Sequence, residues 1–229
     1  MDLPSTDHLQ LLRLLQLASP LLPVGSYSYS EGWESLISQG IINDRVTLQV
    51  WLERELQTGA IQIEAAMMDR AYLAGSQRNT TKLQYWNQWL SAARETEELR
   101  LQSWQMGGSL AKLAIELTPS IQPLIAPMTL PYNYAIVFGI VAQSWQINRQ
   151  TTIAAYLHSW ATNLIGAGIK LIPLGQTAGQ QLLWQIQPEI DLLTQTIPTL
   201  TDEDLYACSW GLSLASMQHE TLYSRLFRS

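Results

Sequence analysis

Apolar residues recur at helical spacing along almost the whole chain, between short polar turns. One repeat, at i, i+3, i+4 and i+8, is formed by Leu48, Trp51, Leu52 and Leu56. A second stripe, with steps of seven, four and three, is formed by Leu99, Met106, Leu110, Leu113 and Leu117. The alternating pattern of strands is scarce, and neither Asn-Gly nor Asp-Gly occurs as a hairpin turn. The pattern predicts an all-α fold, a helical bundle-like domain of about eight to ten helices.

Polar residues indicate where some of these helices begin. Ser28 and Glu31 have the spacing of a capping box, which predicts a helix that starts there and stops at Gly40. Asn148 is a candidate N-cap for a helix over about 149–169. The two signals place helix starts 120 residues apart, so they can be checked independently.

Two proline-rich loops interrupt the helical pattern, at residues 18–28 and 118–131. Each proline removes a backbone donor and turns the preceding residue away from helix. The second loop is the place where the chain could divide into two helical halves. Because neither half shows its own change in composition, we expect one packed domain over residues 1–229.

Composition narrows the classes of protein that fit. Of 229 residues, 47% are apolar and 14% are charged, against a usual charged share of ~25%, which excludes an intrinsically disordered chain. The net charge is −6, and the basic footprint of nucleic-acid binding is missing, so we expect no nucleic-acid partner. The low charge is compatible with two classes: a membrane protein, or a protein whose surface is partly covered by partners.

The apolar stretches do not suit a membrane-spanning helix. The most apolar run, Tyr134–Ala142, is far shorter than the ~20 residues that cross a bilayer. The stretch 153–174 is long enough, but His158, Asn163 and Lys170 interrupt it. We therefore expect no membrane association and read this stretch as a helix buried in a core or an oligomer interface.

The cysteine count and the start of the chain predict the compartment. Cys208 is the single cysteine, so no disulfide can form within the chain. The opening residues lack the basic region and apolar run of a secretory signal. Both observations favour a cytoplasmic protein.

Motifs for enzyme chemistry are missing. The glycine-containing string Gly175–Gly179 lacks the lysine of a phosphate-binding P-loop, and neither G-x-S-x-G nor H-E-x-x-H occurs. The three histidines, His8, His158 and His219, are scattered, so we expect no built-in metal site and no tightly bound cofactor. A helical-bundle hydrolase or lyase stays open as an alternative. Its candidate acids are Glu95, Glu97, Glu98 and Glu220.

The run from Arg94 to Arg100 contains two charge pairs at helical spacing. Arg94 and Glu98 are at i, i+4, and Glu97 and Arg100 are at i, i+3. Such pairs stabilise an exposed helix by about 0.2–0.5 kcal/mol each. Either this face is simply solvated, or it is a polar surface that binds a partner.

Two further segments have the composition of interaction surfaces. Tyr27, Tyr29 and Trp33 lie in the segment Pro23–Glu34, beside a proline–glycine turn. The chain ends in Ser216–Ser229, where leucine and aromatic residues mix with arginines, the residue types of binding hot spots. The first segment is either a core-lining turn or an interface. The second either docks on a partner or folds back on its own core.

Four separate segments, in order along nearly the whole chain, share the motifs of one known family. They are Leu14–Ser30 with Gly32 and Glu34, Ala93–Thr96 with Glu98–Arg100, Leu171–Gln176, and Met217 with His219–Thr221 and Tyr223–Ser229. Together they resemble the UreF family of urease accessory proteins. A generic helical interaction module unrelated to urease remains the alternative.

The resemblance implies a helical homodimer without enzymatic activity. It implies that the chain bridges a UreD/UreH-type accessory protein and the UreG GTPase, and that the assembly docks on apo-urease. The complex would deliver nickel to urease and couple this delivery to GTP hydrolysis, so nickel is handled as cargo and no cofactor is held tightly.

The resemblance also implies which residues bind partners. Those of the C-terminal segment 216–229 are Met217, His219, Glu220, Tyr223, Arg225, Leu226, Phe227, Arg228 and Ser229. Those of a second partner or dimer surface are Pro23, Gly25, Tyr27, Ser28, Tyr29, Glu31, Glu34, Arg94, Glu95, Arg100, Lys170, Gly175 and Gln176.

Overall fold

The computed structural model describes residues 5–229, with side chains from residue 8 onward, so residues 1–4 of the expected domain lie outside it. The helices are α1 (Ser5–Leu17), α2 (Trp33–Ser38), α3 (Arg45–Thr58), α4 (Ala60–Ser76), α5 (Thr80–Ala93), α6 (Glu97–Leu117), α7 (Gln122–Ile125), α8 (Tyr134–Ser144), α9 (Arg149–Leu171), α10 (Gln176–Gln185), α11 (Gln187–Thr196) and α12 (Trp210–His219). Short 3-10 turns are η1 (Ser26–Ser28), η2 (Pro119–Ile121), η3 (Ile197–Thr199) and η4 (Asp202–Asp204). Residues 5–229 contain no strand, and every α-helix except α2 and α7 has ten or more residues, which confirms the predicted all-α fold.

Helix starts follow the sequence signals where a local cap is enough. The Asn148 side chain accepts a hydrogen bond from the backbone N–H of Thr151, so the predicted N-cap of α9 is confirmed. In the same way the Thr96 hydroxyl accepts from the N–H of Leu99 and begins α6. Both caps satisfy donors that the first helical turn leaves free.

The predicted capping box of Ser28 and Glu31 is wrong. The Ser28 hydroxyl donates to the carbonyl of Gly25 (2.7 Å), and the chain forms only the short turn η1 there. Glu31 and Gly32 have φ of 55° and 82°, which are left-handed and incompatible with a continuing helix. The helix starts only at Trp33, and it ends near Gly40 as expected.

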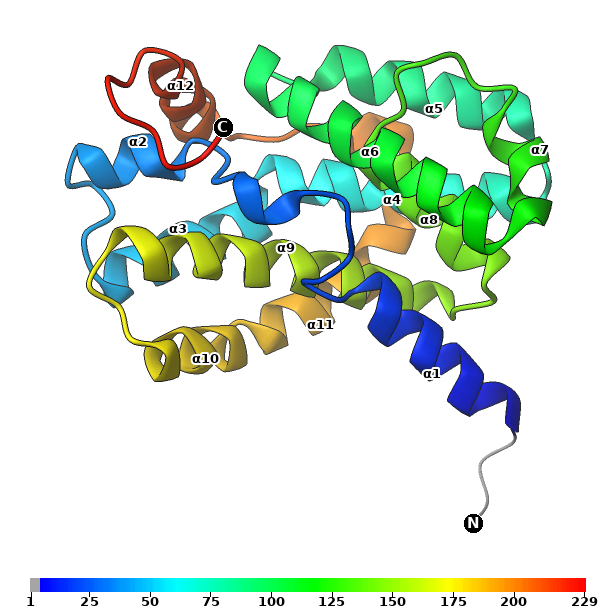
Figure 1. The fold of residues 1–229 in the computed structure, drawn as a ribbon, viewed down its shortest axis with the longest axis horizontal. Coiled ribbons are helices and arrows are strands. Elements are labelled where there is room, and N and C mark those ends of the chain that lie inside the picture. Colours follow the sequence, from blue (N-terminus) through cyan, green and yellow to red (C-terminus); the bar gives the residue numbers. More distant parts are fainter. Residues whose placement is uncertain (1–4) are drawn as a thin grey trace.

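The core is centred on α4, which packs against α3, α5, α8 and α9 (Figure 1). Helix α8 is buried from Ala135 to Ala142, so the most apolar run of the sequence is an internal helix. Gly139 permits its close approach, because a Cβ there would collide with the backbone oxygen of Met68. Helices from before and after the 118–131 loop therefore share one hydrophobic core.

Membrane insertion finds no support in the helices of residues 5–229. Among them, none combines the length and the apolarity that crossing a bilayer requires. The interrupted stretch 153–174 falls largely within α9, where residues such as Ile153, Leu157 and Leu164 are buried.

The end of the chain packs beside α2 and the segment that precedes it. Helix α12 lies against α2 and α6, and the tail that follows it returns over α2 (Figure 1). At the crossing, a Cβ on Gly32 would lie 2.7 Å from the backbone nitrogen of Ser216. Only glycine therefore allows both the left-handed turn before α2 and the close passage of α12.

Replacing Gly32 tests this crossing. We expect Gly32→Ala to lower the free energy of unfolding by about 2–4 kcal/mol, because it adds backbone strain and a collision with α12. The matched control is Gly25→Ala, which has a similar φ of 80° but open space around its Cβ. It should cost about 1 kcal/mol, measured by urea denaturation. Equal losses in the two variants would contradict the close approach.

Candidate docking site and internal cavity

The C-terminal tail runs alongside the segment before α2. The N–H of Arg228 donates to the carbonyl of Ser28 (2.8 Å). The carbonyl of Ser229 accepts from both the N–H and the hydroxyl of Ser30, at 2.6 and 2.7 Å. Phe227 and Ser229 are buried, so the last residues fold back on the chain's own body.

The carboxylate of Glu34 holds the tail from inside. It accepts the backbone N–H of Leu226 (2.7 Å) and of Phe227 (2.9 Å). Glu34 stands in the first turn of α2 and is itself buried. A carboxylate that accepts N–H donors forms bonds stronger than neutral ones, and leaving it unpaired would be costly.

His219, the last residue of α12, lies fully buried between two carboxylates. Its Nε2 is 3.3 Å from Glu34, and its Nδ1 is 2.9 Å from Glu98. Both ring nitrogens therefore lie within hydrogen-bond distance of a carboxylate oxygen. Arg225 of the tail also reaches Glu98 (3.1 Å), so α2, α6, α12 and the tail meet in one ionic cluster.

The opposite side of α12 is apolar and exposed. Trp210, Leu214 and Met217 follow one another at i, i+4 and i+7, and Trp210 is 77% exposed. Tyr223 and Leu226 of the tail are exposed as well. We call these five residues the docking face. Sequence reasoning missed Trp210 and Leu214, although their spacing with Met217 was a readable signal.

The C-terminal residues expected to bind partners thus divide into two groups. His219, Phe227 and Ser229 point inward and hold the segment in place. The exposed members are Met217, Glu220, Tyr223, Arg225, Leu226 and Arg228. A partner that meets the folded chain reaches only the exposed group.

The second set of expected residues is more dispersed. Tyr27 is exposed, whereas Tyr29 is buried and donates its hydroxyl to Gln105. Lys170, at the end of α9, lies 5.3 Å from the ring centre of Phe227, which brings it to the tail. Gly175 and Gln176 begin α10, which packs against α9 and α11.

Arg94 is not part of an exposed charged helix. It follows α5, is buried, and pairs with Glu64 of α4 at 2.6 Å. Because α6 begins only at Glu97, the expected i, i+4 pair with Glu98 does not form. Glu95 is exposed, and Arg100 lies over the ring of Trp104 at 5.7 Å.

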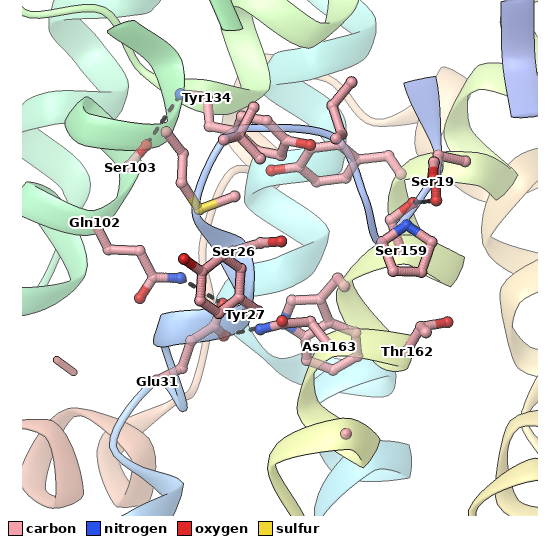
Figure 2. Close-up of a pocket in the computed structure, with 18 of the residues that line it drawn as sticks. Ser19, Ser26, Tyr27, Glu31, Gln102, Ser103, Tyr134, Ser159, Thr162 and Asn163 are labelled. Carbon is pink, nitrogen blue, oxygen red and sulfur yellow. Dashed lines mark hydrogen bonds between the residues drawn. The ribbon is translucent and has the colours of Figure 1, made fainter. Parts of the chain in front are cut away.

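A cavity of about 280 Å³ lies under the 18–28 loop, between α6 and α9 (Figure 2). The carboxyl of Glu31 lines it and accepts from Gln102 Nε2 and Trp160 Nε1, both at 3.0 Å. In the same cavity Glu64 accepts the hydroxyl of Tyr156 (2.8 Å) and forms an ion pair with Arg94. The cavity lining is therefore amphipathic, with charged and amide side chains beside apolar ones.

Burial changes the ionisation of the acidic residues here. Burial, with the charge of nearby Glu64, raises the pKa of Glu31 to about 7. Burial likewise raises the pKa of Tyr156 well above its ordinary value.

Within residues 5–229 no group of three or more His, Cys, Asp or Glu side chains has the arrangement of a metal site.

The four carboxylates of the enzyme alternative do not share one cleft. Glu98 bonds to His219 and Arg225, while Glu97 and Glu220 are exposed. Only Glu95 lines a cavity, a second one of about 280 Å³ next to α4. Paired acid–base work needs two carboxyl groups that flank one reacting atom, and these four do not supply that geometry.

The fold and the site define the chain as an all-α protein with an internally anchored tail and an exposed apolar face. A family model described as UreF matches residues 42–187, and the chain belongs to the UreF family. This membership confirms the resemblance carried by the four sequence segments.

Relatives match nearly the full length. The chain is 61% identical to a urease accessory protein UreF of Nostoc sp., over 98% of this chain and 97% of that protein. It is 54% identical to the protein of that name from Synechocystis sp., over 95% of this chain and 97% of that protein. It is 39% identical to the protein of that name from Janthinobacterium sp., over 96% of this chain and 98% of that protein.

A further buried carboxyl joins α3 to the start of α12. Glu55 accepts the hydroxyl of Ser209 (3.2 Å), and Ser209 in turn accepts from the N–H of Ala60. Burial raises the pKa of Glu55 to about 7. The folded chain therefore keeps this proton up to about pH 7, whereas an unfolded chain releases it near its ordinary value of 4.5.

This difference predicts a pH dependence of stability. The free energy of unfolding should fall as the pH rises from about 4.5 to about 7, and Glu55→Gln should remove about 2 kcal/mol of that fall. Urea denaturation at pH 5 and pH 8 measures how steeply the free energy of unfolding falls with pH in the wild type and in the variant. The exposed Glu116→Gln is the control and should keep the wild-type slope. Equal slopes for wild type and Glu55→Gln would contradict the buried, protonated carboxyl.

Proposed function

We propose that this chain is a non-enzymatic scaffold for nickel insertion into apo-urease. In this proposal it bridges a UreD/UreH-type accessory protein and the UreG GTPase, and it works in the cytoplasm as a homodimer. Membership of the UreF family supports the urease connection. The observation that carries the proposal is the docking face, an apolar surface that the chain builds and then leaves exposed.

The docking face has the properties of a binding hot spot for the UreD/UreH-type partner. It presents tryptophan, leucine, methionine and tyrosine side chains together, and burying each large apolar side chain contributes roughly 1.5–3 kcal/mol. The cluster of Glu34, His219 and Glu98 fixes the segment before any partner arrives. Such preorganisation favours affinity, because less conformational entropy is lost on binding.

In this proposal Pro23–Glu34 and Lys170–Gln176 form the dimer surface or the surface that faces the GTPase. Tyr27 is the exposed aromatic of this surface. Coupling to GTP hydrolysis requires that the chain bind the two nucleotide states of the GTPase with different affinity, since equal affinity shifts no equilibrium. Nickel is cargo of the complex in this proposal, and the chain holds no tight cofactor.

The docking face can be tested directly. We expect the double variant Trp210→Ala, Leu214→Ala to bind a UreD/UreH-type partner at least about a hundredfold more weakly, because two anchors of the hot spot are lost. Calorimetry or quantitative co-purification measures the change. The matched control is Trp184→Ala, Leu192→Ala on α10 and α11, whose side chains are also exposed. Unchanged binding by the first variant would refute the assignment.

Genetics tests the function as a whole. In a strain that lacks this gene we expect urease activity to be lost, because apo-urease receives no nickel. Restoring the gene should restore urease activity. Adding excess nickel to the medium of the deletion strain measures how far free metal can replace delivery by this protein. Normal urease activity in the deletion strain without added nickel would remove the proposal.

A further inference from the structure

The cavity under the 18–28 loop holds a carboxyl group that lacks a cationic partner. Glu31 accepts hydrogen bonds from two neutral donors, Nε2 of Gln102 and Nε1 of Trp160. Among the described residues 8–229 no ion pair includes Glu31, and Arg94 pairs with Glu64. A carboxylate taken out of water is normally paired with a cation, because desolvation disfavours its charged form.

The charges that line the cavity do not balance in its inner part. Glu31 and Glu64 are the carboxyl groups of the lining, and Arg94 and Lys170 are its cations. Lys170 is exposed at the rim, where its ammonium lies over the ring of Phe227. The inner part thus combines two carboxyl groups with one guanidinium. Burial raises the pKa of Glu31 to about 7, so near neutral pH a proton partly neutralises this excess, and a bound cation would replace that proton.

Aromatic side chains form a large part of the cavity wall. They are Tyr27, Tyr134, Tyr156 and Trp160, and Trp160 bonds Glu31 directly. The faces of such rings attract an ammonium group, and they do so more strongly where water is excluded. Leucine, valine and methionine side chains complete the wall. The lining therefore suits a ligand that has a positive charge and an apolar part.

The cavity has the size and the access that a small ligand requires. Its volume is about 280 Å³, whereas a cavity of about 150 Å³ is large enough for benzene. Its lining includes the exposed Pro20 and Tyr27 as well as the buried Leu17 and Tyr156, so it reaches from the surface into the core (Figure 2). A ligand of about ten non-hydrogen atoms therefore fits without a rearrangement of the fold.

We propose that this cavity binds a small organic monocation, a primary ammonium on a short apolar stem, with Glu31 as its counter-ion. The ammonium group has three donors, and the oxygens of Glu31 keep lone pairs beyond those used by Gln102 and Trp160. Asn163 donates through its Nδ2 to the carbonyl of Tyr29, which leaves its side-chain oxygen as a second acceptor in the lining. The aromatic wall would hold the stem.

A metal ion suits the cavity less well than an organic cation. The lining contains neither histidine nor cysteine, the ligands that bind first-row metals best. Its two carboxyl groups are already occupied differently, because Glu64 pairs with Arg94 and Glu31 accepts from two side chains. An apolar and aromatic wall also offers little to the hydration shell of a divalent ion.

Calorimetry of the full-length chain at pH 8 tests the site. The probe is 2-phenylethylammonium, and the neutral 2-phenylethanol has nearly the same size and shape. We expect a dissociation constant of about 1 mM or tighter for the ammonium and at least about tenfold weaker binding of the alcohol. Glu31→Gln should weaken binding of the ammonium at least about tenfold, because the amide keeps the size but carries no charge. The exposed Glu116→Gln is the control and should bind like wild type.

The pH dependence of binding identifies the counter-ion. Only ionised Glu31 pairs with the ammonium, so its pKa of about 7 predicts roughly tenfold tighter binding at pH 8 than at pH 6. The other ionisable groups near it are Glu64, Arg94 and Glu55, with Lys170 at the rim. Because the pKa of Glu55 is also about 7, Glu55→Gln is the control, and it should keep the pH dependence that Glu31→Gln loses.

A second variant blocks the cavity without touching its charges. Gly166 of α9 lines the cavity and has open space around its Cβ position. Gly166→Leu should weaken binding of both the ammonium and the alcohol at least about tenfold, because its side chain takes up part of the volume. Leucine also favours helix over glycine, so the variant should keep its fold. The control Gly108→Leu, at an equally open glycine of α6 outside the cavity lining, should bind like wild type.

Each result supports or overturns the organic-cation site. Equal binding of the ammonium and the alcohol, or no binding of either at about 10 mM, would overturn it. Unchanged binding by both Glu31→Gln and Gly166→Leu would show that the probe binds elsewhere, which also overturns it. Ni²⁺ that binds in a Glu31-dependent way, while the ammonium does not bind, would assign the cavity to a metal ion instead. None of these results bears on the docking face of α12, so the proposed function stands or falls separately.

Discussion

The arrangement of the proposed docking face depends on one buried carboxylate. Glu34 accepts the backbone N–H groups of Leu226 and Phe227 and faces the ring of His219. Hydrogen bonds to a charged group contribute about 1.5–3 kcal/mol each, so this anchor offsets a substantial part of the conformational entropy that the ordered tail loses. The bonds of Ser28 and Ser30 to the last two residues, and the burial of Phe227, complete the attachment of the tail.

The anchor decides which side chains a partner can reach. By turning His219, Phe227 and Ser229 inward, it turns Met217, Tyr223 and Leu226 of the same segment outward. The chain thus builds its docking face from its own end, on a rigid helical body. The same ionic cluster includes Glu98 and Arg225, so a disturbance at the surface can reach α6 directly.

Local signals in the sequence predicted local structure well. The period of the apolar residues predicted α3 and α6, and Asn148 marked the true start of α9 because its cap bonds three residues away. The features that the sequence did not predict depend on contacts between residues that lie far apart in the chain. Ser28 and Glu31 have capping-box spacing, but Glu31 bonds Gln102 and Trp160, and Gly32 makes room for α12. The Glu34 anchor joins residues 192 positions apart, which no local pattern encodes.

Hydrogen exchange at two amides tests the anchor most directly. The N–H groups of Leu226 and Phe227 should exchange slowly in the wild-type chain and at least about tenfold faster in Glu34→Gln, because these two donors bond different carboxylate oxygens and an amide offers only one acceptor oxygen. Amides of the buried helix α8, such as that of Val141, should keep their protection in both proteins. Equal protection of Leu226 and Phe227 in wild type and variant would contradict the account.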